Sequence, residues 1–407
     1  MNAFSSLLAR QVVLFDGGFG SMLVRAKLSA ACPETLNLSR PDAVRRIHAA
    51  YVKAGAQVLE THSLGCNPMQ LKVHGFAGDT PMLAKAAVRN AHAAAGDSAL
   101  VAFSMGTLGA FLAPVGDVTL AQAVEAYAIP ACAAAEAGCD LFIIETMTDI
   151  ADMRAAILAV KPLGLPIVAS FTFQPNGRTL TGGTAACAAL AAEALGVTAL
   201  GINCSGGPQS MLAPLAEMRA VSPLPVIVQP NAGLPTLDEQ GTAHYALTPQ
   251  EMAPMMQAIL QAGAAGIGGC CGTTPEHIEA LQALAAACPP PTPACAHEPM
   301  VSSLRTHLSL RAALESLVTC TLHTPDLGPL YDAEPEEALL LDLRSLSPAD
   351  VSALLPEAQM ACPVPLLLRL SRADALEAAL RAYVGRTAVE VPDALTPLLA
   401  AYGAHKI

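Results

Sequence analysis

The stretch Ala265-Gly266-Ile267-Gly268-Gly269-Cys270-Cys271-Gly272 joins a short apolar run to a glycine-rich turn with two adjacent cysteines. The run, Ala265 to Gly268, is the last of eight β-branched or apolar runs along the chain. The other seven are Val12 to Phe15, Gln57 to Glu60, Leu100 to Ser104, Leu141 to Glu145, Ile167 to Phe173, Ala199 to Asn203 and Val226 to Gln229. Segments rich in Ala and Leu with helical periodicity separate them, which indicates repeated β/α units.

These units decide the predicted fold class, α/β. Eight strands separated by helices within residues 1–290 match a closed (β/α)8 TIM barrel, because an open doubly wound sheet usually has about five to seven strands. Catalytic residues of such barrels lie where the strands end. Polar or glycine-rich segments follow nearly every run, so we expect a polar ring at one mouth of an apolar barrel. They are Asp16-Gly17-Gly18, Glu60-Thr61-His62, Ser104-Met105-Gly106, Glu145-Thr146, Asn203-Cys204, Pro230-Asn231 and Gly269-Cys270-Cys271-Gly272.

A small α/β domain is predicted after the barrel. The helix expected over Pro275 to Cys288 runs into a proline cluster, which cannot continue a helix or enter a central strand. We therefore divide the chain into a barrel at residues 1–290, a proline-rich linker at 291–300 and the small domain at 301–407. Within that domain we expect strands at Ala338 to Leu343 and Pro365 to Leu370, and a helix at Ser371 to Tyr383.

The composition excludes several classes of protein. Hydrophobic residues make up 53% of the chain and charged residues 14%, which is typical of a compact enzyme rather than a disordered chain. The net charge of -12, without a Lys/Arg cluster or a Trp, argues against nucleic-acid binding. Glu193 and Gly196 interrupt the apolar stretch from Ala185 to Ile202, so we expect a helix and a strand there, and no transmembrane segment.

The expected compartment bears on the chemistry of the twelve cysteines. The first residues, MNAFSSLLARQVVLF, lack the pattern of a signal peptide, so we expect a cytoplasmic protein. Cysteines in that compartment are usually thiols or metal ligands rather than disulfides.

Three cysteines meet the specification of a catalytic zinc site, which uses three protein ligands and leaves a fourth position open. Cys204 follows the sixth run, and Cys270 and Cys271 follow the eighth, so all three should converge at one mouth of the barrel. Spacing alone leaves ordinary packing as an equal alternative, because cysteine is among the most buried residue types. Cys32 and Cys66 lie nearer loops and lack a converging partner. We expect the remaining seven to be packing residues: Cys132, Cys139, Cys187, Cys288, Cys295, Cys320 and Cys362.

Five segments closely resemble the homocysteine-binding barrel of the homocysteine S-methyltransferase family. They are Asp16-Gly17-Gly18-Phe19-Gly20, Glu145-Thr146-Met147, Gly201-Ile202-Asn203-Cys204, Gln229-Pro230-Asn231-Ala232-Gly233-Leu234-Pro235 and Gly268-Gly269-Cys270-Cys271-Gly272-Thr273-Thr274-Pro275. The segments occur in the order of the family, and a GGCCG that follows an NC is a specific pattern. The family includes the amino-terminal part of cobalamin-dependent methionine synthase, betaine-homocysteine methyltransferase and S-methylmethionine-dependent enzymes.

The resemblance implies a zinc-dependent homocysteine S-methyltransferase that forms methionine. Cys204, Cys270 and Cys271 would be the zinc ligands, and the ion would hold the homocysteine sulfur as a thiolate, which is the reactive form of a thiol. By the same likeness, Glu145 would lie near the ammonium group of the substrate, and the backbone of Asp16-Gly17-Gly18 near its carboxylate.

Two further residues are expected near this site. Family members usually read Glu-Thr-Asn-Thr-Phe after the second strand, whereas this chain has Glu60-Thr61-His62-Ser63-Leu64. We expect His62 to lie beside the zinc ligands rather than bind the metal, because a single histidine is more often a hydrogen-bonding residue. Asn231 is expected to organise its loop near the site.

The methyl donor is predicted to be methylcobalamin. No DxHxxG cobalamin-ligating motif occurs in the chain, so the corrinoid would be carried by a separate protein. Betaine is disfavoured, since aromatic faces bind quaternary ammonium groups best and only 4% of the residues are aromatic. S-methylmethionine and S-adenosylmethionine are the main alternative donors.

The small domain resembles a truncated folate-binding domain, the pterin-binding barrel that follows the homocysteine barrel in cobalamin-dependent methionine synthase. This likeness suggests that it helps to dock the corrinoid protein. Arg369 stands where that barrel usually has a pterin-facing aspartate, and Glu390 where it has an asparagine, which weighs against folate binding.

Two other functions stay open at this point. One is a thiol or selenol methyltransferase, or a demethylase, that uses the same zinc on another substrate in a corrinoid pathway. The other is a non-catalytic metal-binding barrel, which the intact cysteine trio argues against.

Overall fold

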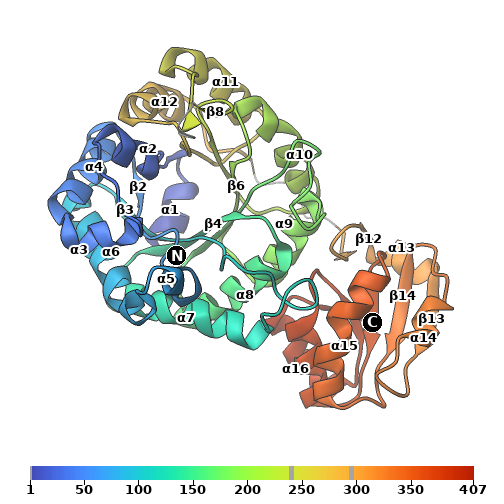
Figure 1. Cartoon of the computed structure of the whole chain (residues 1–407). Coiled ribbons are helices and arrows are strands. Elements are labelled where there is room, and N and C mark those ends of the chain that lie inside the picture. Colours follow the sequence, from blue (N-terminus) through green and yellow to red (C-terminus); the bar gives the residue numbers. More distant parts are fainter. Residues whose placement is uncertain (1, 238–242, 293–297) are drawn as a thin grey trace.

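Eight parallel strands form a closed barrel in the computed structural model, which describes residues 2–237, 243–292 and 298–407 (Figure 1). They are β1 Val13–Leu14, β2 Val58–Glu60, β3 Leu100–Met105, β4 Leu141–Met147, β5 Ile167–Phe171, β6 Ala199–Cys204, β7 Val226–Pro230 and β10 Gly266–Ile267. Each strand pairs with its neighbours in this order, and a parallel bridge between Phe15 and Val58 joins the first strand back to the second. The predicted α/β TIM barrel is therefore confirmed.

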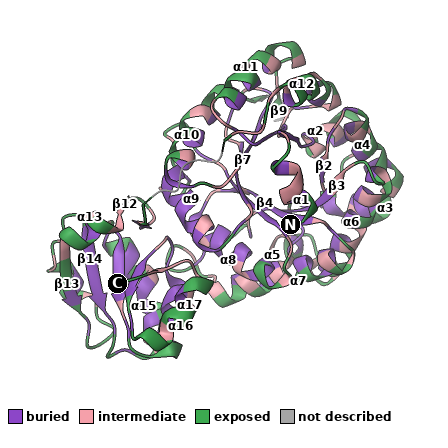
Figure 2. Cartoon of the chain, turned by 180° about the vertical axis from the view of Figure 1, so that it is seen from behind, coloured by how far each residue is buried: buried purple, intermediate pink, exposed green. Residues whose placement is uncertain are grey.

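Helices surround the barrel, and their inner sides are buried with the strands while their outer sides are exposed (Figure 2). The strands are mainly apolar because the helices cover one face and the barrel interior covers the other, and several of their polar residues, such as Glu60 and Asn203, lie at or near the carboxyl ends. Several helices begin at a residue suited to capping; Thr119 and Thr248 both form capping boxes. The helices are α2 Phe19–Arg25, α3 Leu36–Ser39, α4 Pro41–Lys53, α5 Pro68–Val73, α6 Thr80–Ala95, α7 Leu120–Glu136, α8 Ile150–Val160, α9 Ala185–Ala194, α10 Leu212–Val221, α11 Pro249–Gln261 and α12 Pro275–Ala287.

A short amino-terminal helix, α1 (Ala3–Leu8), closes one end of the barrel. Its Phe4 and Leu8 pack against side chains near the amino-terminal ends of the strands, among them Val13, Leu141 and Val168. The opposite end, where the strands finish, remains open to the connecting loops. One of these loops contains the short antiparallel pair β8 (Thr236–Leu237) and β9 (Ala243–His244).

The carboxy-terminal part contains a second sheet with five parallel strands in sequence order in its described residues, 298–407. Its strands are β13 Leu317–Thr321, β14 Ala338–Asp342, β15 Leu366–Arg369, β16 Ala388–Glu390 and β17 His405–Lys406. One face packs on the helices α14 Gly328–Tyr331, α15 Pro348–Ala361, α16 Ala373–Ala382 and α17 Thr396–Ala401. The other face packs on the hairpin β11 Met300–Ser302 and β12 His307–Ser309 and on α13 Leu310–Glu315.

The expected elements agree with the structure in position. The eight barrel strands lie within two residues of their predicted ends, and Ala185 to Ile202 divides into α9 and β6. The helix predicted at Pro275 is α12, and the two strands and the helix predicted in the small domain are β14, β15 and α16. The structure adds strands that the sequence did not reveal; β13, for example, is largely exposed and so lacks an apolar run.

The packing prediction for the other cysteines is confirmed for Cys139, Cys187, Cys320 and Cys362, which are buried, whereas Cys288 is half-buried. It is wrong for Cys132, which is exposed because it lies on the outward side of α7. Cys295 lies outside the described residues.

The predicted domain boundaries stay a prediction, and residues 293–297 of the expected linker fall outside the described ranges. Within the described ranges, no helix is both long enough and apolar enough to cross a membrane.

Candidate active site

The structure brings the three predicted metal ligands together at the open end of the barrel. Cys204 is the last residue of β6, and Cys270 and Cys271 follow β10. The Sγ atom of Cys204 lies 3.2 Å from that of Cys270 and 3.8 Å from that of Cys271. Among the residues that the structure describes, these are the ones grouped closely enough to hold a metal ion, with all three sulfur atoms within 4.8 Å of one another.

The backbone around these cysteines adopts a conformation that is uncommon for residues with a side chain. Cys204 and Ser205 have φ angles of 58° and 50°, in the left-handed region, which costs about 1 kcal/mol or more for each residue. Hydrogen bonds hold the turns in place: the Ser205 hydroxyl accepts from the N–H of Phe173, and Asn231 Oδ1 accepts from the N–H of Cys271 at 3.0 Å. The neighbouring loops therefore determine the direction of the sulfur atoms.

Hydrogen bonding among the three thiols makes them chemically unequal. The pKa of Cys271 is lowered to about 3, because Cys204 and Cys270 donate to its sulfur. The pKa of Cys270 is raised in turn, mainly by its contact with Cys204. Of the three thiols, Cys271 is therefore the one that the hydrogen bonds favour most as a thiolate.

A pocket of about 500 Å³ opens directly onto the thiols. Its lining includes all three cysteines, Gly17 and Gly18 from the loop after β1, and the strand-end carboxylates Glu60 and Glu145. No lysine or arginine lies among the described residues that line it. The pocket is therefore suited to a small ligand that carries a positive charge.

Glu145 lines the same pocket as the cysteines, and it is held by two neighbours. Its Oε1 accepts from the Ser104 hydroxyl at 2.6 Å, and its Oε2 accepts from Asn203 Nδ2 at 3.3 Å. Burial raises the pKa of Glu145 to about 7. A ligand cation would offset this burial cost, because an opposite charge favours the ionised form.

Asn203 connects Glu145 to the three cysteines. Its Nδ2 also lies 3.8 Å from Cys270 Sγ, and its Oδ1 accepts from the N–H of Thr146 at 2.9 Å. Thr146 has a φ of 58°, so this hydrogen bond supports a further left-handed residue, at the pocket wall.

The loop after β1 packs closely against the cysteine loop. A Cβ atom on Gly18 would lie 2.5 Å from the carbonyl oxygen of Cys270, and one on Gly17 would lie 2.7 Å from Thr273 Oγ1. Only glycine permits this approach. Gly18 also donates its N–H to Thr273 Oγ1 at 3.0 Å, so that amide is already occupied.

Asp16 supports the same region from below the pocket surface. It is 1% exposed, and its Oδ2 accepts from the N–H of Glu60 at 3.0 Å, while its Oδ1 has no partner among the described residues. Burial raises the pKa of both Asp16 and Glu60 well above the usual range for carboxyl groups.

His62 lines the pocket but is separate from the cysteine group found in the described residues. Its Nε2 lies 2.9 Å from the carbonyl oxygen of Pro33, and its ring stacks on Phe19 at 4.4 Å. The ring therefore joins the loops after β1 and β2.

Several residues of this site were missed as functional residues by the sequence reasoning. Asn203, Ser104 and Glu60 were noted as strand-end residues without a role, although their polar character at the end of buried strands was an available signal. Gln229 was missed as well, and its Nε2 donates to Glu60 at 2.7 Å. Only the closed barrel shows that these positions lie together: Glu60 and Ser104 line the pocket, and Asn203 and Gln229 bond to its carboxylates.

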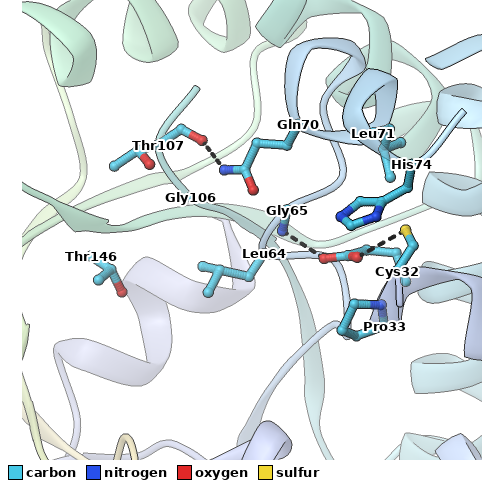
Figure 3. A pocket seen from close by; sticks show the side chains of 11 residues that line it. Cys32, Pro33, Leu64, Gly65, Gln70, Leu71, His74, Gly106, Thr107 and Thr146 are labelled. Atoms are coloured by element: carbon cyan, nitrogen blue, oxygen red, sulfur yellow. Dashed lines mark hydrogen bonds between the residues drawn. The ribbon is translucent and has the colours of Figure 1, made fainter. Parts of the chain in front are cut away.

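A smaller pocket of about 300 Å³ adjoins the main one (Figure 3). Pro33, Glu34, Leu64 and Thr146 line both pockets. Glu34 fixes the wall between them, because its carboxylate accepts from the N–H of Gly65 at 2.9 Å and from Cys32 Sγ at 3.5 Å.

The ends of the strands in the second sheet carry a chain of ion pairs. Arg369, at the end of β15, lies 2.7 Å from Glu390 Oε2 at the end of β16 and 3.5 Å from Asp342 Oδ2 at the end of β14. Arg344 also pairs with Asp342, at 2.8 Å. Arg369 and Glu390, the two residues that depart from the pterin-binding pattern, therefore pair with each other.

A model described as homocysteine S-methyltransferase matches residues 13–285, which is more than half of the chain. The chain belongs to this family. Among its homocysteine S-methyltransferase relatives, methionine synthase of Mycobacterium tuberculosis (strain ATCC 25618 / H37Rv) is 34% identical over 319 residues, and that of Mycobacterium leprae (strain TN) is 34% identical over 324 residues. Each match covers 74% of this chain and 27% of the relative, so the chain spans about a quarter of the length of these curated proteins.

Solved structures resemble this homocysteine S-methyltransferase family member as well. The homocysteine methyltransferase MmuM of Escherichia coli in its metallated form has a TM-score of 0.58 and 23% identity, and the match covers 67% of this chain and 96% of that one. Its apo form has a TM-score of 0.52 and 25% identity, covering 67% and 95%. The predicted family, and with it the S-methyltransferase type of enzyme, is confirmed by the family model and the methionine synthase relatives, whereas the likeness to MmuM supports the fold.

Proposed function

We propose that the chain is a zinc-dependent homocysteine S-methyltransferase that forms methionine, with methylcobalamin on a separate corrinoid protein as the methyl donor. The observation that carries this proposal is the position of three thiols at the wall of a pocket that also contains buried carboxylates. A soluble thiol enzyme of this kind would work in the cytoplasm, where thiols stay reduced.

The spacing of the sulfur atoms fits a zinc ion. Zn–S bonds of about 2.3 Å in tetrahedral geometry place sulfur ligands about 3.8 Å apart, and the Cys204 contacts of 3.2 and 3.8 Å need only a small adjustment. Bound by Cys204, Cys270 and Cys271, zinc would supply the Lewis acidity that keeps a substrate thiol in its reactive thiolate form. The pocket beside the thiols leaves room for that substrate.

The protein residues would orient the amino-acid end of homocysteine. Glu145 would bind the ammonium group, because it is a buried carboxylate without a cationic partner in a pocket lacking lysine and arginine among the described residues. The Asp16-Gly17-Gly18 loop would lie at the substrate carboxylate. Asn231 would hold the Cys271 turn through its amide oxygen, and His62 would hold the loop wall.

The loops and helices at the open end of the barrel support a donor that arrives on a protein. Exposed large apolar side chains stand on the loops and helices that follow several barrel strands, and such groups usually mark interaction surfaces. They are Val24, Leu64, Phe111, Val115, Leu180 and Leu234, with exposed fractions from 40% to 72%.

The second domain would assist this docking rather than bind a pterin. The internal pairing of Arg369 with Glu390 and Asp342 satisfies the charges at the strand ends where a pterin would be held.

A donor screen tests the proposal. Purified protein with measured zinc content is incubated with homocysteine and, separately, methylcobalamin with a corrinoid protein, S-methylmethionine or S-adenosylmethionine. We expect methionine from the methylcobalamin sample. Turnover with S-methylmethionine but none with methylcobalamin would show that the proposed donor is wrong. Full activity of the metal-free protein would exclude a role for zinc.

A cysteine pair supplies the matched control. Cys271→Ser should lose bound zinc and activity, whereas Cys132→Ser, which changes an exposed cysteine on α7, should keep both. Equal zinc content in the two variants would contradict the assignment of the ligands.

The second candidate function is a corrinoid-pathway thiol methyltransferase that acts on another substrate. The pocket of about 500 Å³ favours keeping this candidate, since it also has room for thiols larger than homocysteine. Competition decides between the two candidates. If homocysteine is the natural substrate, it should inhibit methyl transfer to another thiol, and it should bind at least as tightly as that thiol.

A further inference from the structure

The second domain packs on the outer side of the barrel, beside α7 and α8 (Figure 1). Arg154, on α8, reaches the carboxy-terminal end of α16, where it donates to the carbonyl oxygens of Leu380 and Arg381. A second contact joins Arg386 to Glu193 on α9 at 2.8 Å. Arg154 thus caps a helix of the other domain, an arrangement that favours a cation.

A cleft of about 550 Å³ lies between the two domains at this contact. Its apolar walls come from both sides: Leu112, Leu120 and Ala121 before and within the first turn of α7, and Ala353, Pro356 and Val384 from the second domain. Cavities at domain interfaces with apolar walls and a few polar groups are the usual form of small-molecule sites, and this volume is in their range.

The charges at the cleft are unbalanced toward positive. Arg154 is 3% exposed, and its described hydrogen-bond partners are carbonyl oxygens rather than carboxylates. Arg381 also lines the cleft and forms no ion pair with a described residue. Glu357 is the one acidic residue among the described lining residues, so two guanidinium groups face a single carboxylate.

A buried cation without an anionic partner is costly, because burial removes its hydration. The desolvation is strong enough to lower the pKa of Arg154 to about 10. Lys161, a neighbour of Arg154, adds to the positive charge on this side of the barrel.

We propose that this cleft binds a small carboxylate with an apolar body, which would pair with the arginines and pack against the apolar walls. The carboxylate would contact Arg381 and approach Arg154, and the apolar body would lie between Ala121 and Ala353. Because both domains supply the walls, the ligand would stabilise their docked arrangement. The site is separate from the cysteine pocket and does not depend on the proposed methyl transfer.

Calorimetric titration of the full chain with sodium octanoate tests the site, without homocysteine or donor. Octan-1-ol provides the same apolar body without the charge, and sodium phosphate provides an anion without the apolar body. We expect saturable octanoate binding that also raises the melting temperature, and no saturable binding of octan-1-ol or phosphate. Absence of saturable octanoate binding, or octan-1-ol or phosphate binding as tight as octanoate, would overturn the proposal.

Two variants and one control locate the binding. Arg381→Gln should weaken octanoate at least about tenfold, since a charge-assisted hydrogen bond is lost, and Ala353→Phe should block the cleft. Arg372→Gln changes an exposed arginine of the same region that pairs with Asp374, outside the cleft lining, and should bind like the parent protein. Unchanged octanoate affinity in both Arg381→Gln and Ala353→Phe would contradict this site.

Discussion

Asn203 and Glu145 show how single side chains connect the two halves of the pocket. Asn203 bonds to the Glu145 carboxylate and approaches Cys270, so the amino-acid end and the sulfur end of a substrate would be positioned by one network. Glu145 is buried without a cation, which makes it sensitive to the charge of its ligand.

Substitution of Glu145 by Gln tests the ammonium role. The variant keeps the shape but removes the charge, so we expect the KM for homocysteine to rise about tenfold or more, because a charged hydrogen bond contributes about 1.5 to 3 kcal/mol. Zinc content should not change. Steady-state kinetics measure this effect, with Glu136→Gln, an exposed residue on α7, as the control. An unchanged KM would remove Glu145 from the substrate site.

Asp152 provides a titration that is remote from the cysteines. It lies on α8, its carboxylate accepts from the Tyr127 hydroxyl at 2.8 Å, and burial raises its pKa from 3.8 to about 7. Between these values the native state holds a proton that the unfolded state has lost, so stability falls as the pH rises from about 4 to 7.

The variant Asp152→Asn should flatten this dependence. We expect its free energy of unfolding to decrease less steeply over that range, by up to about 1.4 kcal/mol per pH unit relative to the parent protein. Urea denaturation at several pH values measures the slope. Parallel slopes for the two proteins would mean that Asp152 titrates normally.

At the scale of elements, the barrel strands explain why the cysteines meet. β6 and β10 both border β7, so the ends of these strands lie at the same edge although the cysteines are far apart in sequence. The short helix α1 performs a different task, because it fills the opposite end of the barrel with Phe4 and Leu8.

Removal of the α1 anchor should weaken the barrel. Phe4 is 1% exposed and its ring meets that of Phe15 edge to face at 6.2 Å. We expect Phe4→Ala to lower the free energy of unfolding by about 3 kcal/mol, since a large core aromatic leaves a cavity. Ser6→Ala, on the same helix and exposed to a larger extent, is the matched control. A loss below about 1 kcal/mol would show that α1 is not part of the core.

At the scale of the whole molecule, polar contacts join the two domains. Arg154 of the barrel bonds to α16 of the second domain, and Arg386 of the second domain pairs with Glu193 of the barrel. These side chains are largely buried. Their loss should affect the docking of the domains more than the barrel core.

Arg154→Met tests this coupling. We expect calorimetric unfolding to separate into two transitions, because hydrogen bonds to a charged group of about 2 kcal/mol are lost at the interface. The exposed variant Arg46→Met should keep the profile of the parent protein. A single transition at the parent temperature for Arg154→Met would show that the arginine does not couple the domains.

The sequence alone was sufficient for the barrel and for the three cysteines. Alternating β/α patterns follow from local propensity and burial, so the eight strands were visible within two residues of their ends. The paired cysteines after the last strand, together with Cys204, formed a pattern specific enough to identify the family, which the match at residues 13–285 confirms.

Tertiary structure decided which other side chains share the pocket and how the second domain is placed. Ser104 and Glu60 line the pocket and Asn203 bonds to Glu145 beside it, although all three come from separate strands. No local pattern states that their side chains meet; the closure of the barrel between Phe15 and Val58 brings them together. The interdomain cleft at Arg154 likewise depends on long-range contacts. Short-range sequence patterns determine elements, whereas the packing of distant elements determines sites.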